Sequence, residues 1–195
     1  MIDKQAASDA RRLEASLGQL PQPVAKPAFV IVSGLPGTGK SFFSNRLVER
    51  VQLLILESDT LRRVLFTLPT YSAEESARLF RAIHGLIEEL LKKGIPLVLD
   101  ATNLSEANRE IMYNIADRVG ASLVIVRVSA PQAVVRERLR VRAEARTPEN
   151  HSDADWATYQ MLKPSVEKIQ RQHFAVNTSR DINPVLDKIV REIKR

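Results

Sequence analysis

The sequence contains no cysteine, which excludes disulfide bonds and thiolate metal sites. It also lacks any apolar run close to the roughly 18 residues that a membrane-spanning helix needs. The N-terminal residues are too polar for a secretory signal peptide. These absences exclude disulfide-stapled and membrane-spanning classes of protein, and we expect a soluble cytoplasmic protein without a membrane partner.

The composition is typical of one globular domain. Of the 195 residues, 44% are hydrophobic, which is enough for a substantial core. The net charge of +6 favours anionic partners, but it does not distinguish a nucleotide from a nucleic acid. The sequence shows neither an internal repeat nor a low-complexity segment, and it leaves the oligomeric state open.

Residues 1–27 form a segment in front of the main domain, which spans 28–195. Apolar residues recur in this segment at spacings of three and four, as on one face of an amphipathic helix. They are Ile2, Ala6, Ala10, Leu13, Leu17 and Leu20. The proline-rich stretch 21–27 ends the helix and acts as a stiff connector. We expect the helix to pack on the main domain; a contact between two copies of the chain is the alternative.

Short apolar runs alternate with helical patterns from Ala28 onward. The expected strands are Ala28–Val32, Val51–Leu56, Ile95–Leu99, Ser122–Val128 and Phe174–Val176. The first four are continuous runs of Val, Ile and Leu, as in strands that are covered on both faces. The expected helices are 39–50, 73–93, 106–119 and 132–145, with a last one starting near Pro184. This alternation predicts an α/β fold: a doubly wound, parallel, five-stranded sheet with helices on both faces.

The stretch Ser33–Ser41, SGLPGTGKS, follows the first expected strand and contains the full G-x-x-x-x-G-K-[ST] pattern. Its glycines let backbone N–H groups turn toward phosphate oxygens, and the following helix adds its N-terminal dipole. The lysine places a charge between the β- and γ-phosphates, and the serine hydroxyl ligates Mg²⁺. A glycine-rich turn without a ligand is the alternative, but a strand before it and a helix after it favour a P-loop. The expected cofactor-binding residues here are Gly34, Pro36, Gly37, Thr38, Gly39, Lys40 and Ser41.

Asp59 and Arg62 follow the second expected strand and lie three residues apart, so they share a helical face. Ligands of open α/β sheets bind at the carboxyl edge of the strands, where this pair would lie. A carboxylate there can accept the proton of an attacking hydroxyl, and an arginine beside it can hold an anion. The alternative is that Asp59 caps a helix and Arg62 is solvated surface.

Asp100 ends the third expected strand, and small and polar residues follow it. An acid at this position commonly supports the Mg²⁺ shell, directly or through water, or orients Lys40 and Ser41. Asn103 would stand at the same edge as a substrate-binding residue. Asn103 or Ser105 could instead cap the next helix.

The helical stretch 132–145 is rich in arginine. Arg138 and Arg142 lie four residues apart on one face, where a lid over 131–152 could close on nucleotide phosphates. The alternative is a solvated charged face, which suits the remaining arginines better. These are Arg136, Arg140 and Arg146.

The ordered set of motifs resembles the small P-loop kinases of the polynucleotide 5′-kinase type, within the wider group that holds zeta-toxin and related predicted kinases. The resemblance runs from about Val30 to Asn177. The motifs that carry it are GLPGTGKS, SDTLR, VLDATNLSEANR, ERLRVR and DADWATYQMLKPS. It implies a P-loop NTPase fold with an arginine-bearing lid helix, ATP and Mg²⁺ as cofactors, and a hydroxyl-bearing acceptor.

The resemblance also implies roles for individual residues. Lys40 and Ser41 would bind phosphates and Mg²⁺, and Asp59 would be the general base on the acceptor hydroxyl. Arg62 would contact the acceptor, and Arg142, with Arg138, would be the lid arginine on the donor phosphates. Three residues of the stretch behind the lid could pack either on the acceptor or in the core, namely Trp156, Tyr159 and Met161.

These observations predict an ATP-dependent phosphotransferase with an alcohol group as acceptor. The resemblance and the basic charge favour a nucleic-acid 5′-hydroxyl as the acceptor. A small metabolite or antibiotic is the first alternative. The second is an ATP-hydrolysing regulatory switch that works through a partner bound to the N-terminal helix. Specificity depends on pocket shape and single contacts, so the motifs do not decide among them.

Overall fold

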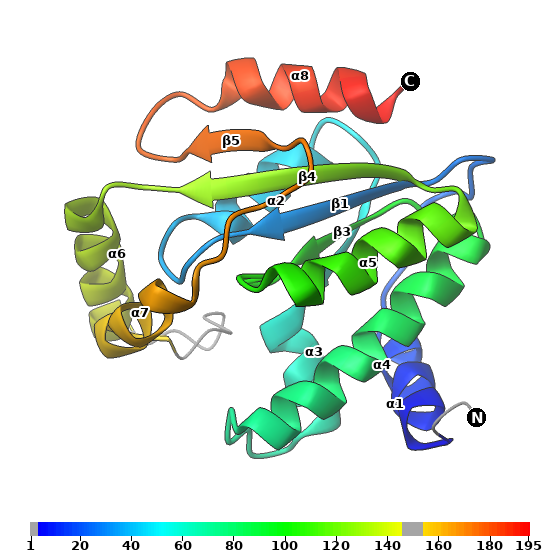
Figure 1. Cartoon of the computed structure of the whole chain (residues 1–195), viewed down its shortest axis with the longest axis horizontal. Coiled ribbons are helices and arrows are strands. Elements are labelled where there is room, and N and C mark those ends of the chain that lie inside the picture. The colour runs from blue at the N-terminus through cyan, green and yellow to red at the C-terminus, as the bar shows by residue number, and fades with distance from the viewer. Residues whose placement is uncertain (1–3, 146–153) are drawn as a thin grey trace.

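A parallel five-stranded sheet forms the centre of the molecule (Figure 1). The computed structural model describes residues 4–145 and 154–195. The strand order is β2-β3-β1-β4-β5, and every neighbouring pair is parallel. The strands are β1 (Ala28–Ser33), β2 (Leu54–Glu57), β3 (Leu97–Asp100), β4 (Ser122–Ser129) and β5 (Phe174–Asn177).

Helices connect successive strands and cover both faces of the sheet. They are α1 (Lys4–Ala15), α2 (Lys40–Val48), α3 (Ser58–Leu65), α4 (Ala73–Lys92), α5 (Glu106–Val119), α6 (Gln132–Ala145), α7 (Trp156–Leu162) and α8 (Asn183–Ile193), with the 3-10 turn η1 (Lys163–Ser165). Figure 1 shows α6 and α7 beyond the carboxyl ends of the strands. The predicted fold class, a doubly wound parallel sheet of five strands, is confirmed.

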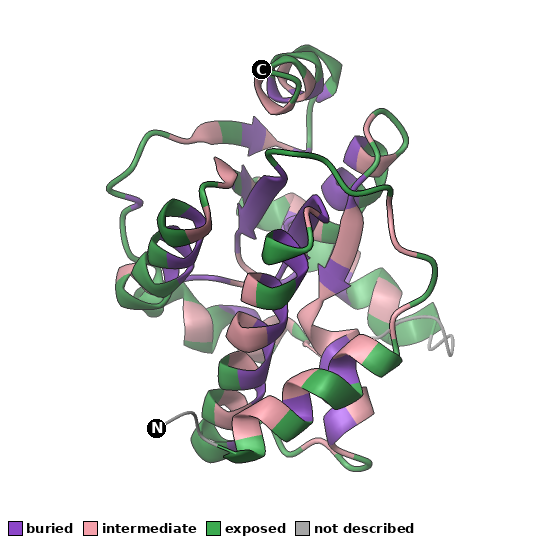
Figure 2. Cartoon of the chain, turned by 90° about the vertical axis from the view of Figure 1, so that its right-hand side faces the viewer, coloured by how far each residue is buried: buried purple, intermediate pink, exposed green. Residues whose placement is uncertain are grey.

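Alternate side chains of the central strand supply two separate cores. All six residues of β1 are buried. Phe29 and Ile31 join the core under α1, α3, α4 and α5, and Val30 and Val32 join the core under α2 and α8. Because successive side chains of a strand point to opposite faces, a run of large apolar residues needs cover on both sides. Figure 2 shows the buried residues along the middle of the molecule and exposed residues on the outer helix faces.

The N-terminal helix α1 packs on the main domain, as expected. Its apolar face contributes Leu13 to the core, and its contacts are with α3 and α4. The carboxylate of Asp9 is fully buried and accepts hydrogen bonds of 2.7 and 2.9 Å from Arg78 of α4. Ala10, Leu17 and Leu20 of the expected stripe also pack against this core, and Ile2 lies outside the described residues. Within residues 4–145 and 154–195, no helix is long and apolar enough to cross a membrane.

Some boundaries differ from those expected, because glycine and proline limit where an element can begin or continue. Helix α2 begins at Lys40 rather than 39, since Gly39 has φ +92°. Strand β3 begins after Pro96, which cannot donate to a ladder. Helix α7 ends at Leu162 and continues as η1, which contains Pro164. Residues 146–152 of the expected lid, Arg146 included, lie outside the described residues.

Candidate active site

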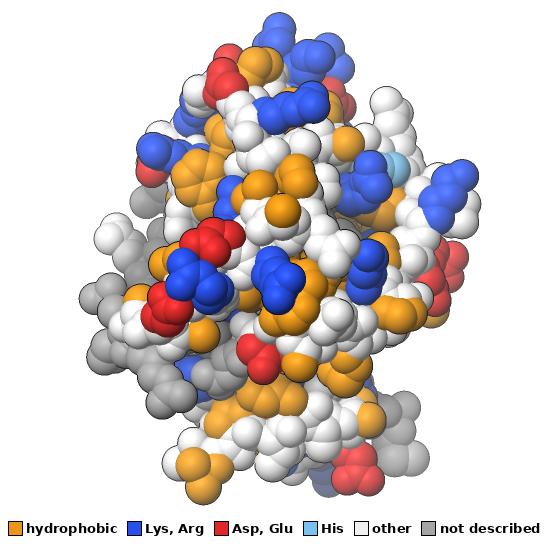
Figure 3. All heavy atoms as spheres, turned by 90° about the vertical axis from the view of Figure 1, so that its left-hand side faces the viewer, with side chains coloured by type: hydrophobic (Ala, Val, Ile, Leu, Met, Phe, Trp, Pro, Cys, Tyr) orange, Lys and Arg blue, Asp and Glu red, His pale blue; other side chains and the backbone are white. Residues whose placement is uncertain are grey.

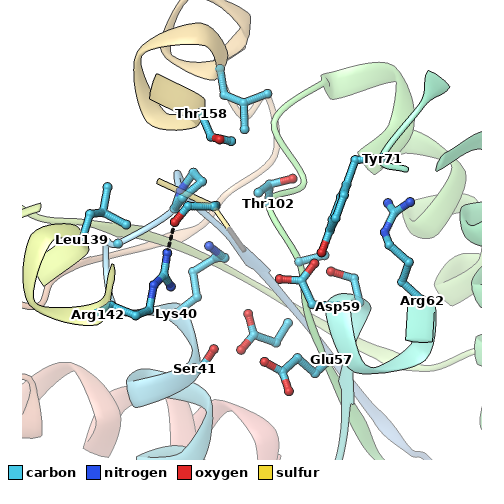
Figure 4. Close-up of a pocket in the computed structure, with 18 of the residues that line it drawn as sticks. Lys40, Ser41, Glu57, Asp59, Arg62, Tyr71, Thr102, Leu139, Arg142 and Thr158 are labelled. Carbon is cyan, nitrogen blue, oxygen red and sulfur yellow. Dashed lines mark hydrogen bonds between the residues drawn. The ribbon is translucent and has the colours of Figure 1, made fainter. Parts of the chain in front are cut away.

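A cavity of about 690 Å³ lies at the carboxyl edge of the sheet. The P-loop and α2 form one wall, and the ends of β2 and β3 form the floor. Helices α3 and α4 form the opposite wall, and α6 and α7 close the cavity from above (Figure 4). Open parallel α/β sheets bind their ligands at this edge. Most of the predicted site residues therefore border one space.

The P-loop uses its glycines for two different purposes. Gly37 and Gly39 adopt φ values of +76° and +92°, which favour glycine, and both line the cavity. Gly34 does not line it: a Cβ there would stand 2.4 Å from the carbonyl oxygen of Val128, so glycine permits close approach to β4. Thr38 is likewise buried within the protein and does not line the cavity. Its hydroxyl donates to the carbonyl of Leu35 at 2.7 Å. Gly34 and Thr38 thus shape the loop, whereas Gly37 and Gly39 present backbone to the cavity.

We expect Gly39→Ala to weaken ATP binding by about tenfold or more. A Cβ at Gly39 would need the strained left-handed conformation and would lie 3.0 Å from the Thr178 hydroxyl oxygen. Gly120→Ala is the matched control, because Gly120 also has a positive φ, +71°, but faces open space. Calorimetry of ATP binding to both variants checks this prediction. Equal affinities for ATP would contradict the role of the Gly39 backbone.

Lys40 stands between the P-loop and the acidic floor. Its Nζ donates to the carbonyl of Leu35 at 3.2 Å. Burial lowers the pKa of the Lys40 ammonium, and Asp100 and Asp59 oppose this change through their negative charges. The ammonium therefore lies in a partly desolvated place beside two carboxylates, where a third anionic group such as a phosphate would be strongly attracted.

Two acids, Asp100 and Glu57, lie on the floor of the cavity. Only Asp100 is expected there from the sequence. Burial raises the pKa of the Asp100 carboxyl, while the charge of Lys40 and a hydrogen bond with Ser41 oppose the rise. Glu57 stands beside Asp100 in the neighbouring strand, in direct register, and also lines the cavity. Glu57 could have been found from its position at the end of β2. It was not predicted, because the strand expected from the sequence ends one residue earlier.

Asp59 lies in the first turn of α3 and borders the cavity. Figure 4 shows its carboxylate on the side of the cavity opposite Arg142, with the end of the Tyr71 side chain directed toward it. The first turn of a helix favours a negative charge through the helix dipole. The N-cap of α3 is Glu57, so Asp59 is not the N-cap residue of this helix. This geometry suits a group that acts on a ligand.

Arg62 lies beside Asp59, but its guanidinium is engaged within the protein. Its Nη1 donates to Glu75, its Nη2 donates to Ser76 Oγ at 3.2 Å, and its face lies 4.7 Å from the Tyr71 ring centre. The side chains of Arg62 and Glu75 are each only 7% exposed. Arg62 is therefore a buried ion-pair member, which disagrees with the expectation of an arginine presented to an acceptor anion.

Glu75 is the anchor of this pair. Burial alone would raise the pKa of its carboxyl, but hydrogen bonds from Thr70, Arg62 and Tyr71 outweigh burial and hold the pKa at about 2. Ser72 caps α4 by accepting from Glu75 N at 3.2 Å. Glu75 therefore fixes the turn before α4, including Tyr71, whose φ is +55°.

We expect the Glu75 interactions to be lost in acid. A folded-state pKa lowered from 4.5 to about 2 stabilises the fold fully above pH 4.5 and progressively less as the pH falls toward 2. The contribution is about 3 kcal/mol. Urea unfolding at several pH values checks this: Glu75→Gln should flatten the acid dependence, whereas the exposed neighbour control Glu74→Gln should keep the wild-type dependence. Identical curves for all three proteins would contradict it.

Asn103 does not line the cavity, so the structure does not support the expected substrate contact. Its side chain is 6% exposed, and its Nδ2 donates to the carbonyl of Val32 at 2.7 Å. It does not cap α5 either, since Ser105 is the N-cap and makes no side-chain cap bond. The carbonyl of Asn103 accepts from the fully buried Arg109, which also donates to the carbonyls of Glu167 and Lys168. Asn103 thus holds the loop after β3 in place. The residue before Asn103, Thr102, borders the cavity.

The two predicted lid arginines both line the cavity. Arg138 donates to the hydroxyl of Thr178 at 2.8 Å and to its carbonyl at 2.9 Å, which ties α6 to the loop after β5. Arg142 donates to the carbonyl of Ala154, at the start of the segment that leads into α7 (Figure 4). Trp156 and Tyr159 stack and pack against α6, whereas Met161 is exposed and borders the cavity.

The fold and the loop together define the class of protein. A parallel sheet of order 2-3-1-4-5, with a P-loop between β1 and α2, is that of a P-loop NTPase. A family model described as an AAA domain matches residues 29–169. The chain therefore belongs to this AAA domain family.

The comparisons with individual proteins agree with this class. The L-seryl-tRNA(Sec) kinase of Methanococcus maripaludis is 26% identical over 114 residues, which cover 56% of this chain and 44% of that protein. Kti12 of Chaetomium thermophilum, solved with ADP-AlF3, has a TM-score of 0.67 and 21% identity over 85% of this chain and 98% of its own. The APS kinase CysC of Mycobacterium tuberculosis, solved with AMPPNP and APS, has a TM-score of 0.64 and 17% identity over 89% and 100%.

These relatives bear out the broader part of the resemblance drawn from the motifs. A P-loop NTPase is confirmed, and two of the three relatives are named as kinases. The narrower resemblance to polynucleotide 5′-kinases is not specifically shown by these comparisons. The two structures also show nucleotides bound to this fold.

Proposed function

We propose that this protein is an ATP-dependent kinase that transfers the γ-phosphoryl group to the hydroxyl of a small molecule. The observation that carries the proposal is the arrangement of one cavity: Lys40 and Ser41 of the P-loop on one side, and the carboxylate of Asp59 on the other. The two kinases among the relatives support the reaction class. A phosphoryl group held by the P-loop would face a hydroxyl held near Asp59.

In the proposed reaction, the acceptor oxygen attacks the γ-phosphorus in line with the leaving oxygen. The new O–P bond forms as the bond from that phosphorus to the β–γ bridging oxygen breaks, and ADP leaves. Asp59 takes the proton of the acceptor hydroxyl. Lys40 and Arg142 stabilise the negative charge on the transferring group, and Arg138 holds the lid helix beside the nucleotide.

The residues on the floor fit Mg²⁺. The Ser41 hydroxyl and the Asp100 carboxylate supply hard oxygen ligands, interact with each other and both border the cavity, and we propose Ser41 as a ligand, with Asp100 acting directly or through water. The described part of the chain holds no group of three His, Cys, Asp or Glu placed for a metal. Mg²⁺ in kinase sites is usually held by one or two protein groups plus waters and phosphate oxygens. When bound, it would neutralise charge on the β- and γ-phosphates.

A nucleic acid is the weaker choice of acceptor, because the arginine helix does not form a continuous cationic track. Arg140 pairs with Glu137 and Glu144, and Arg136 lies over the ring of Trp156. Figure 3 shows basic, acidic and apolar side chains interspersed on the face that carries α6 and α7. Phosphate backbones are bound by clustered cations whose charge is available.

Transfer of label from ATP tests the proposal. The protein is incubated with γ-labelled ATP, Mg²⁺ and panels of hydroxylated metabolites and antibiotics, with 5′-hydroxyl oligonucleotides as a separate panel. We expect label in a small molecule and none in the oligonucleotides. Label in the oligonucleotides alone would overturn the choice of acceptor. ATP hydrolysis that no compound stimulates would instead favour the regulatory switch.

A further inference from the structure

A buried hydroxyl connects the lid helix α6 to the P-loop. It belongs to Thr178, which directly follows β5 and is 7% exposed. The hydroxyl donates to the carbonyl of Thr38 at 2.6 Å and accepts from Arg138 Nη1 at 2.8 Å. A hydroxyl has one hydrogen to donate and lone pairs that accept, so both bonds form at the same time. Three segments that are far apart in the sequence therefore meet at one oxygen atom.

The position of Thr178 is fixed by its own surroundings. Its backbone N–H donates to the carbonyl of Ser129, at the end of β4, at 3.0 Å. The side-chain oxygen of Asn177 accepts from the backbone N and the Oγ of Ser179 at 3.0 and 2.7 Å, which shapes the turn around Thr178. The hydroxyl therefore stands at a set place relative to the carboxyl edge of the sheet.

Two P-loop glycines leave room for this junction. A Cβ at Gly39 would lie 3.0–3.2 Å from three side-chain atoms of Thr178. A Cβ at Gly37 would lie 2.9 Å from Leu139 and 3.0 Å from Val135, which are the buried residues of α6. At such distances the neighbouring atoms would have to move, because the interior is close-packed. Thr178 and α6 are thus both seated directly on the backbone of the P-loop.

Arg138 directs its hydrogen bonds to the same junction. Besides the hydroxyl of Thr178, it donates to the carbonyl of Thr178 at 2.9 Å and makes a longer contact of 3.5 Å with the carbonyl of Gly37. Arg142, one turn further along α6, instead donates to the carbonyl of Ala154. The two predicted lid arginines therefore differ: Arg138 holds the P-loop and the loop after β5, and Arg142 holds the segment before α7.

We infer that Thr178 is a positioning residue for the nucleotide site. Its hydroxyl holds Arg138, and with it α6, against the P-loop, and it fixes the carbonyl of Thr38 within that loop. The backbone N–H groups of a P-loop bind phosphate only while the loop keeps its shape. Thr178 is not among the described residues that line the cavity, so it acts through Arg138 and Thr38. This inference rests on the proposed function and adds a residue that the P-loop motif does not contain.

Removal of the hydroxyl alone tests the inference. Thr178→Val keeps the branched shape of the side chain, but it leaves the Thr38 carbonyl and one Arg138 N–H without their partner. Because a buried polar group without a partner is costly, we expect the affinity for an ATP analogue with Mg²⁺ to fall about tenfold or more. Thr178→Ser keeps the hydroxyl and should bind the analogue nearly as well as the wild type. Calorimetry well below the unfolding midpoint of each protein is the measurement.

The serine variant and a control separate the hydroxyl from general packing. Equal losses of affinity in Thr178→Val and Thr178→Ser would overturn the inference, because the shape of the side chain would then matter and not the hydroxyl. Ser44→Ala removes another fully buried hydroxyl, in α2, which has no hydrogen-bond partner among the described residues. This control should leave the affinity for the analogue unchanged.

Arg138→Lys tests the connection from the other side, and it decides if Thr178→Val does not fold. Lysine keeps the charge but lacks the planar fork that bonds the hydroxyl and the carbonyl of Thr178 together. We therefore expect weaker binding of the analogue, and unchanged binding would overturn the inference. The double variant with Thr178→Val should bind no more weakly than the weaker single variant. Losses that multiply would show that the two residues act independently, which contradicts the inference.

Calorimetry of the wild type distinguishes this inference from the proposed function. If the wild type does not bind the ATP analogue, the proposed kinase function is contradicted, and the role of Thr178 falls with it. If the wild type binds the analogue and Thr178→Val binds it equally tightly, only the role of Thr178 is contradicted.

Discussion

Asp59→Asn is expected to slow phosphoryl transfer by about 10² to 10⁴, the usual contribution of a general base. Asparagine keeps the shape of the side chain but cannot accept the hydroxyl proton. Because Asp59 stands on the wall opposite the P-loop, binding of ATP·Mg²⁺ should stay near normal. The measurement is steady-state turnover with the identified acceptor, together with ATP affinity by calorimetry.

The Asp100→Asn variant is compared with Asp59→Asn, because Asp100 is assigned to the metal and Asp59 to the acceptor. Asp100 interacts with Ser41 and with the charge of Lys40, so its loss should raise the Mg²⁺ concentration needed for half-maximal turnover and also lower turnover. Turnover of both variants is measured across a range of Mg²⁺ concentrations. If Asp59→Asn loses ATP·Mg²⁺ affinity and keeps its rate at saturating Mg²⁺, the roles of the two acids are reversed.

Lys40→Ala is expected to lower turnover by about 10² to 10³, by analogy with the removal of one preorganised electrostatic donor, and to weaken ATP binding. The ammonium is the cation of the P-loop, and the negative charges of Asp100 and Asp59 act on it. Without it, these carboxylates would repel the phosphates. The fold should survive, because Lys40 begins α2 at the edge of the sheet and belongs to neither core.

Lys188→Ala provides the control for Lys40, since Lys188 is exposed on α8 and does not line the cavity. It should leave both ATP binding and turnover unchanged. Thermal unfolding of both variants shows whether the fold is kept. Unchanged ATP affinity in Lys40→Ala would remove the basis for assigning the P-loop to nucleotide binding.

The sequence by itself determined the sheet and the nucleotide side of the cavity. Strand β1 is an uninterrupted apolar run, which only a strand covered on both faces can bury, and the two cores confirm this. The P-loop pattern is local in sequence, so its spacing alone identifies the turn, although Gly34 is also required by its close approach to Val128 of β4. Asp59 and Asp100 could be predicted as cavity residues because Asp100 ends β3 and Asp59 comes shortly after the end of β2.

The tertiary structure decided what each polar side chain on the acceptor side meets. Arg62 and Glu75 are thirteen residues apart and form a buried ion pair, which no spacing rule connects. Asn103 turns to the backbone of β1, seventy-one residues away along the chain, and Glu57 gains its neighbour Asp100 only through strand register. The physical reason is that the charge a ligand meets depends on which partners reach that side chain from other elements, and those partners are set by packing.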